Sequence, residues 1–177
     1  MYPARSRIIP TGVERFFDTE EIIVTKTDVA GRITYANPVF LRMAGYTEAE
    51  AIGAPHSLIR HPEMPRAVFK LLWDRILGGH EIFAYVNNMA STGDHYWVYA
   101  HVSPTYDASG ALVGFHSNRR VPDRAPLDAV RPLYAALLAE ERRHDDRARG
   151  LEASFDMMVG ILKGAGVTYD EWVWSLR

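Results

Sequence analysis

The chain has 177 residues, a length that suits one domain or one domain with an appendage. Hydrophobic residues make up 47% of it, enough for a proper core, and the formal net charge of -2 gives no basic footprint for nucleic acid. The lack of cysteine excludes disulfides, thiolate metal ligands and thiol nucleophiles. No apolar run suits a signal peptide or a transmembrane helix, so we expect a cytoplasmic protein without membrane insertion.

Residues 1–19 are predicted to form an arm that caps the rest of the chain. Residues 1–12 show no clear period and are expected to be extended or loosely ordered. Residues 13–19 suit a short helical turn, which would dock Phe16 and Phe17 on the core.

Two strands and two short helices are predicted to follow this arm. Residues 21–27 are β-branched and residues 32–36 alternate, so the two segments favour a β-hairpin. Asn37 is the expected N-cap of a helix that ends at Gly45. A capping box that begins at Thr47 starts the second short helix.

A segment rich in proline and histidine, residues 53–65, separates these helices from a longer one. Proline disfavours the helical conformation at the residue before it, so this segment is expected to be a loop. Loops that concentrate ionisable groups are common places for binding sites. After Pro65, apolar residues recur at helical spacing until Gly78.

Three further strands are predicted over residues 82–89, 95–103 and 111–118, and they form an antiparallel meander. Residues 20–121 are therefore expected to form one α+β domain. Residues 122–177 form a helical extension with an aromatic last segment. So apolar an end must be covered, either by the chain's own sheet or in a homodimer.

This order of elements resembles the PAS domains, and more narrowly the sensory PAS domains of the aerotaxis receptors. The run G-x-P-H-x₃-R-H-P-E-M-P over residues 53–65 is the most specific motif. The resemblance covers residues 20–138 and implies a PAS fold, in which a five-stranded antiparallel sheet and short helices surround a central pocket. Further motif residues are Tyr35 to Phe40, Gly45 to Thr47, Phe69 to Trp73, Asn88, Gly93 to Val98, and Gly114 with Phe115.

The resemblance also implies a cofactor, because the pocket of that family holds FAD non-covalently. It implies a redox or oxygen sensor that signals through protein–protein contact to an unknown partner or a second copy, and not an enzyme. By motif position, it assigns to the flavin pocket Asn37, Arg60, His61, Glu63, Trp73 and Asn88. Trp97 is the expected neighbour in the pocket wall.

These residue types suit a flavin, because an isoalloxazine ring needs an apolar slot with a few amides at its edge. The asparagines supply the amides and the tryptophans the walls. Arg60 and His61 are expected to face the ribityl or diphosphate group, where a forked cation is well suited. Purely structural roles stay open: Asn37 as a helix cap, Arg60 and His61 as pins of the loop, and Trp73 as a core residue.

Two other functions stay open. A cofactor-free PAS module would act through protein contacts alone, with side chains or a small metabolite in its pocket. A haem gas sensor would use one axial imidazole, for which the candidates are His56, His61, His101 and His116. No His-x₃-His or similar ligand spacing is present, so no dedicated metal site is expected.

Overall fold

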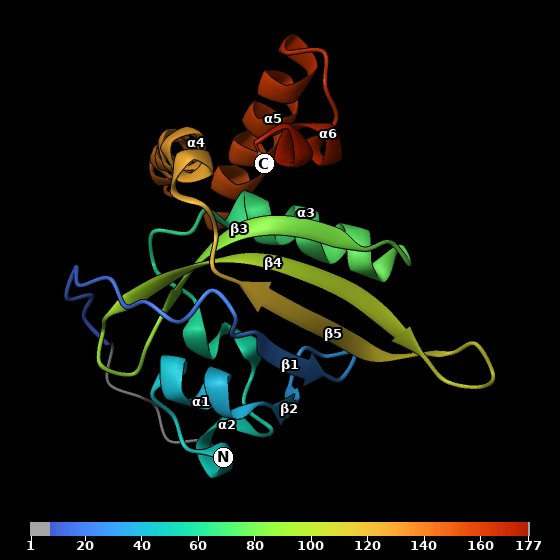
Figure 1. Cartoon of the computed structure of the whole chain (residues 1–177). Helices are drawn as coiled ribbons and strands as arrows, with labels where there is room; N and C mark the ends of the chain where they lie inside the picture. The colour runs from blue at the N-terminus through green and yellow to red at the C-terminus, as the bar shows by residue number, and fades with distance from the viewer. Residues whose placement is uncertain (1–7, 177) are drawn as a thin grey trace.

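The computed structural model describes residues 8–176, so the first seven residues of the predicted arm lie outside it. A five-stranded antiparallel sheet with the strand order β2-β1-β5-β4-β3 runs through this range. Helices lie on both sides of the sheet, as Figure 1 shows. The predicted α+β class and the five-stranded antiparallel sheet are confirmed.

The first half of the chain follows its local signals closely. The Asn37 side chain accepts the N–H of Phe40 at the start of the first helix, and Gly45 ends that helix with a φ of 70°. Thr47 and Glu50 form the predicted capping box. The resulting elements are β1 (Ile23–Thr27), β2 (Ile33–Ala36), α1 (Pro38–Ala44) and α2 (Glu48–Ala51).

The loop rich in proline and histidine contains a single turn of 3₁₀ helix, η1 (His56–Ile59). It leads into the long helix α3 (Arg66–Leu77), which Pro65 precedes. Arg60 forms an isolated antiparallel bridge to Asn88, so the loop is fastened along the outer edge of β3.

The meander consists of β3 (Ile82–Met89), β4 (His95–Tyr106) and β5 (Leu112–Arg120). β3 has its predicted bounds, whereas β4 and β5 continue beyond residues 103 and 118, where their prediction ended. The register pairs Asn88 with Tyr96 and Val86 with Val98. Because side chains alternate along a strand, these four residues share the inner face of the sheet.

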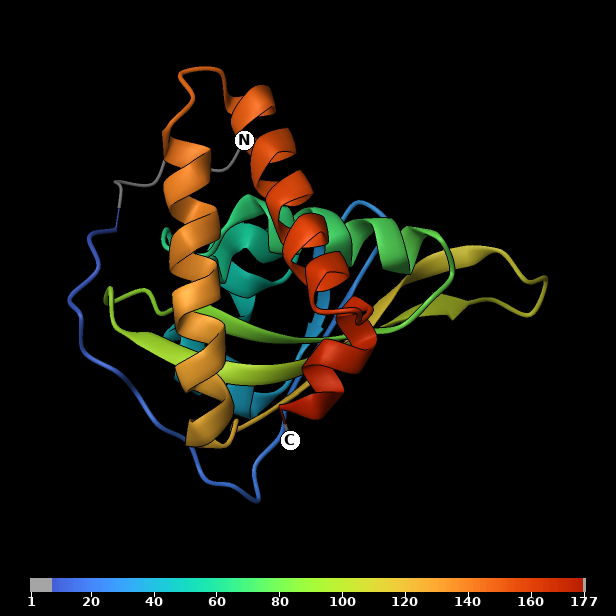
Figure 2. The same cartoon turned by 90° about the horizontal axis from the view of Figure 1, so that it is seen from above.

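The C-terminal extension consists of α4 (Arg124–Arg142), α5 (Arg147–Gly164) and α6 (Tyr169–Ser175). α4 and α5 lie side by side as a hairpin above the sheet (Figure 2). The Tyr134 hydroxyl donates to the carbonyl of Tyr85 over 2.8 Å, and Trp174 packs edge-on against Phe83 at 4.9 Å. The extension therefore packs on the outer face of the chain's own sheet.

Residues 13–18 form no helix and Thr19 lies in a turn that the Glu21 N–H closes on the Asp18 carbonyl, which corrects the helical turn predicted for residues 13–19. Glu14 forms a parallel bridge to His95, and the Arg15 N–H donates to the His95 carbonyl over 2.7 Å. These contacts use backbone groups that a helical turn would have paired locally. Phe17 packs against the core as expected, whereas Phe16 is 65% exposed. Within residues 8–176, no helix has the length and apolar character needed to cross a membrane.

Candidate functional site

A cavity of about 270 Å³ lies between the inner face of the sheet and the segment that runs from η1 to α3. The helical side of the cavity is mainly apolar, and the sheet side has both apolar and polar side chains. The apolar residues that line the whole cavity are Ala30, Pro55, Ile59, Phe69, Leu72, Trp73, Ile76, Val86, Ala100, Val102 and Phe115. A flat and largely apolar ligand suits such a slot.

The sheet side of the cavity carries a buried cation, Arg119 of β5, which is 5% exposed. Its Nη2 donates to the Thr25 hydroxyl over 3.0 Å and lies 2.6 Å from Nε2 of His56. Its Nη1 has no hydrogen-bond partner among residues 8–176. Burial lowers the pKa of Arg119 to about 10, so the guanidinium is still charged at neutral pH.

His56 accepts this hydrogen bond, because a guanidinium has only donors to offer. The Nε2 atom is therefore unprotonated, and the ring is the neutral Nδ1–H tautomer. Desolvation, and then the charge of Arg119, lower the pKa of His56 to about 3. The His56 ring thus adds no second positive charge beside Arg119 and provides no negative charge to balance it.

Two further polar side chains of this wall are unpaired. Nδ2 of Asn88 and Oγ of Ser117 are buried, and neither has a partner in the described part of the chain. A buried polar group left unpaired costs roughly 1–3 kcal/mol. Together with Nη1 of Arg119, they are three hydrogen-bonding groups that favour a ligand with several acceptor atoms.

Three of the residues predicted for the site line the cavity: Arg60, Trp73 and Asn88. The Arg60 guanidinium lies 4.1 Å from the centre of the Phe69 ring. Trp73 packs edge-on against Phe115 and closes against the turn between β1 and β2. At Gly31 in that turn, a Cβ atom would lie 3.0 Å from the Trp73 ring, and the φ of 76° also requires glycine.

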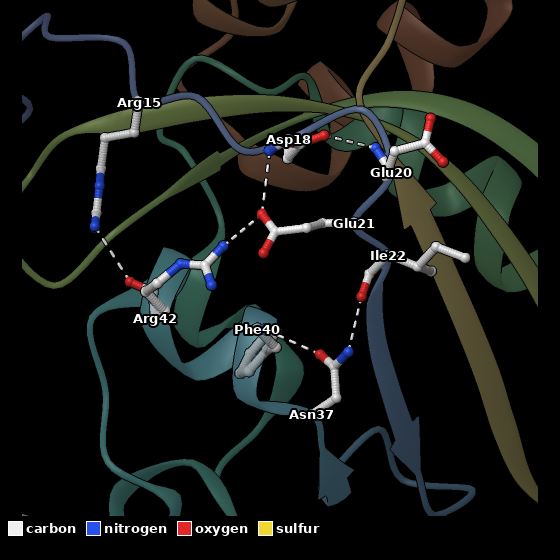
Figure 3. A network of polar contacts seen from close by, with 8 residues as sticks. All are labelled: Arg15, Asp18, Glu20, Glu21, Ile22, Asn37, Phe40 and Arg42. Atoms are coloured by element: carbon white, nitrogen blue, oxygen red, sulfur yellow. Dashed lines mark hydrogen bonds and ion pairs between the residues drawn. The ribbon is translucent and has the colours of Figure 1, made fainter.

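Asn37 does not line the cavity, contrary to expectation. Its Oδ1 accepts the N–H groups of Val24 and Phe40, and its Nδ2 donates to the carbonyl of Ile22 over 2.7 Å. Figure 3 shows the contacts to Ile22 and Phe40, beside the ion pair of Glu21 with Arg42. The side chain therefore joins the start of β1 to α1 and has the structural role that the sequence had left open.

His61 and Glu63 are also outside the cavity lining. The His61 ring is buried against the ring of His95, 5.7 Å away, and its Nδ1 accepts the N–H of Glu63. The Glu63 side chain is exposed on the loop. His61 thus contacts the start of β4 and Glu63 faces solvent, so Arg60 alone of this group lines the cavity.

Trp97 lies on the opposite face of the sheet, which corrects its expected place in the pocket wall. The register that turns Asn88 and Tyr96 inward turns the next residue of β4 outward. The Trp97 ring lies 6.3 Å from that of Tyr134 in α4, with the Arg131 guanidinium 5.5 Å from its centre.

Sequence reasoning missed Ser117 and Arg119 and considered His56 only as a haem ligand. The usable signal is the alternation Phe115, Ser117, Arg119 along the last strand, which places a polar pair on an inward face. The strand was predicted to end at residue 118, so Arg119 fell outside it. Thr25 of β1 faces the same wall.

The four histidines considered for haem are dispersed. Only His56 lines the cavity, and its Nε2 faces the Arg119 guanidinium. His101 pairs with Glu81 over 2.7 Å, and His116 contacts Asn118, both on the outer face. No group of three or more acidic or histidine side chains in residues 8–176 could hold a metal ion.

Comparison with known proteins agrees with this fold. A family model described as the PAS fold matches residues 33–119. The aerotaxis receptor of Escherichia coli (strain K12) is 38% identical over 117 residues, which cover 66% of this chain and 23% of the receptor. The nitrogen fixation regulatory protein of Klebsiella pneumoniae is 27% identical over 99 residues, or 56% of this chain and 20% of that protein.

A solved structure of similar fold is the dark state of the blue-light photoreceptor Aureochrome1 LOV. It has a TM-score of 0.52 and 26% sequence identity, and the match covers 68% of this chain and 84% of that one. The matched segment and the five-stranded sheet define a PAS domain in this chain. Within that class, the domain resembles the one in the aerotaxis receptor, although the chain spans less than a quarter of the length of these curated relatives.

Proposed function

We propose that the cavity binds a flavin, FAD first among them, and that the chain is a redox or oxygen sensor rather than an enzyme. The unpaired polar groups of the sheet carry this proposal: Arg119 Nη1, Asn88 Nδ2 and Ser117 Oγ all lie on the sheet side of a slot whose helical side is mainly apolar. The resemblance to the aerotaxis-receptor PAS domains supports the same ligand.

The donor set fits one edge of an isoalloxazine ring. The pyrimidine edge of that ring carries carbonyl oxygens, which would accept hydrogen bonds from Arg119, Asn88 and Ser117. The dimethylbenzene part would lie between Trp73 and the aliphatic side chains of the slot. When bound, a flavin supplies reversible one- and two-electron redox chemistry.

Arg60 and Trp73 have different roles in this proposal. Arg60 is held beside the cavity by Phe69 and by a hydrogen bond to the Met64 carbonyl, so its charge is available to the ribityl or phosphate part of the ligand. Trp73 closes the slot against the turn at Gly31 and excludes water.

Arg119 is the residue best placed to respond to the charge of the ligand. Its guanidinium also touches Thr25 of β1 and His56 of η1, so a change in the ligand's charge would redistribute hydrogen bonds across two elements. Such a shift can bias a two-state surface toward a signalling partner.

The cofactor-free alternative explains the cavity less well. It leaves Nη1 of the charged Arg119 side chain and two neutral polar groups buried without partners in the part of the chain that the structure describes. The haem alternative requires Nε2 of His56 to give up its hydrogen bond with Arg119 and coordinate the iron instead.

Titration of the flavin-free protein with FAD, FMN and riboflavin tests the proposal. We expect saturable binding and strong quenching of flavin fluorescence, because Trp73 lines the slot. Comparison of the three ligands separates the contribution of the ring from that of the phosphate and adenosine parts. Failure of all three to bind a folded, flavin-free protein would overturn the proposal.

A further inference from the structure

The helix that forms one wall of the cavity has no N-terminal cap of its own. α3 begins after Pro65, which makes no side-chain capping hydrogen bond. The first N–H groups of a helix need acceptors from elsewhere. Here Ala67, which is fully buried, donates its N–H to Oε1 of Glu141 over 3.1 Å. Glu141 lies in α4, 74 residues further along the chain.

The Glu141 carboxylate ties three helices together. Its Oε2 accepts from Nε of Arg66 over 2.8 Å, and the Arg66 side chain also donates to the carbonyl of Arg147 at the start of α5. At Gly150 a Cβ atom would lie only 2.6 Å from the Glu141 carbonyl oxygen, so α5 crosses α4 closely at this point. Both carboxylate oxygens are used, and the side chain is 5% exposed.

This position is electrostatically favourable for α3, because a negative charge at a helix N-terminus interacts well with the helix dipole. It is also close enough to influence the cavity. Burial lowers the pKa of the Arg60 guanidinium, and the negative charge of Glu141 opposes that change. Glu141 therefore stabilises two positive charges, those of Arg66 and Arg60, beside the cavity wall.

If this cap were lost, α3 would shift and the cavity residues on it would move with it. Phe69 lies on the first turn beyond the capped residues, and both it and Trp73 line the cavity. Arg60 stacks on Phe69, so a tilt of the helix would move the aromatic wall and the cation together.

We propose that Glu141 is a positioning residue for the cavity, which holds α3 in its binding geometry and thereby couples the ligand to the α4–α5 hairpin. Coupling between two sites is reciprocal, so a ligand that needs α3 in place also fastens the hairpin. How firmly the hairpin packs on the rest of the domain then depends on whether the cavity holds a ligand. The inference rests on the proposed function for the choice of FAD as its probe.

The first test compares FAD affinity of full-length variants. We expect Glu141→Gln, which removes the charge at constant shape, to weaken FAD binding about tenfold, and Glu141→Asp to recover part of this loss. Glu140→Gln is the matched control, because that neighbour pairs with Arg143 and His144 within the hairpin region and should change affinity less than about twofold.

A second control separates positioning from general loss of stability. Tyr134→Phe removes the hydrogen bond of α4 to the Tyr85 carbonyl without touching α3. We expect it to lower the melting temperature while FAD affinity is kept. Equal weakening of FAD binding by Tyr134→Phe and Glu141→Gln, at equal loss of melting temperature, would contradict a positioning role.

Hydrogen exchange provides a readout that needs no flavin. Without ligand, Glu141→Gln should speed exchange in the first turn of α3 and in residues 56–65, as well as in α4. With FAD, exchange in α4 and α5 should slow in the wild-type chain and change little in Glu141→Gln. Faster exchange confined to α4 and α5 would overturn the inference. A wild-type chain that binds no FAD would instead overturn the proposed function, and the positioning role of Glu141 would then be tested by the flavin-free exchange data alone.

Discussion

Arg119 brings a permanent charge into the inner face of a sheet whose other side chains are mostly apolar. Its two described partners, Thr25 and His56, are neutral. None of the ion pairs found in residues 8–176 involves this arginine. A buried charge without a counter-charge destabilises the folded state, so the arginine is better explained by a ligand than by folding.

Replacement of Arg119 by methionine tests this explanation. We expect Arg119→Met to raise the free energy of unfolding of the flavin-free chain by about 1–3 kcal/mol, because an uncompensated buried charge is removed. FAD affinity should fall about 100-fold, because a charged hydrogen bond to the ligand is lost. Urea unfolding and flavin titration measure the two effects. The control is Arg120→Met, at the neighbouring exposed position on the same strand.

Unchanged FAD affinity in Arg119→Met would show that the arginine does not contact the ligand. A large loss of stability in the flavin-free variant would instead give Arg119 a structural role.

His56 makes stability depend on pH. Its pKa is about 3 in the folded chain and 6.5 ordinarily, so the unfolded chain binds more protons between these values. The contribution of neutral His56 to stability is therefore fully present above about pH 6.5. It falls as the pH decreases toward 3, by at most about 1.4 kcal/mol per pH unit. The partial exposure of this residue reduces the slope.

Urea unfolding of His56→Gln at about pH 7 and about pH 5 measures this contribution. Glutamine can still accept the Arg119 hydrogen bond but does not titrate, so the variant should lose less stability on acidification than the wild-type chain. Equal losses in both chains would mean that His56 is not held neutral.

Asn37 joins the start of β1 to α1 through three hydrogen bonds to main-chain groups. We expect Asn37→Ala to lower the free energy of unfolding by about 2–3 kcal/mol, because the helix loses its cap and β1 loses two partners. Folded variant protein should bind FAD as the wild-type chain does. Weaker FAD binding with unchanged stability would restore Asn37 to the ligand site.

Elements specified by local signals were predictable from the sequence. The cap at Asn37, the capping box at Thr47 and the glycine stop at Gly45 depend on residues within one turn of each other. The non-helical path around Glu14 was not predictable, because it results from pairing with His95, which is distant in sequence.

The site was only partly predictable, because side-chain direction in a sheet depends on register. Asn88 and Trp97 were both expected in the pocket, but the pairing of Asn88 with Tyr96 turns Trp97 outward. Arg119 was missed for a related reason, since its strand continues two residues beyond its predicted end. The motif over residues 53–65 located the correct loop but did not distinguish Arg60 from His61.

In the whole molecule, the boundary at residue 121 separates a part with strands and helices from a part with helices alone, but it does not separate two independent cores. Leu127, Val130 and Leu137 of α4 belong to the same buried cluster as Tyr85 and Val98 of the sheet. Glu141 extends this continuity to the N-terminus of α3. The C-terminal helices therefore cover the outer face of the sheet, and α4 also contacts α3, the helix that forms one wall of the cavity.

Flavin binding is tested by the absorption spectrum of the freshly purified 177-residue chain, followed by chromatography of what denaturation releases. We expect a flavin spectrum and the release of FAD in proportion to protein, with both strongly reduced in Arg119→Met. A folded chain that is colourless, releases no flavin and takes up none when FAD is added would contradict it.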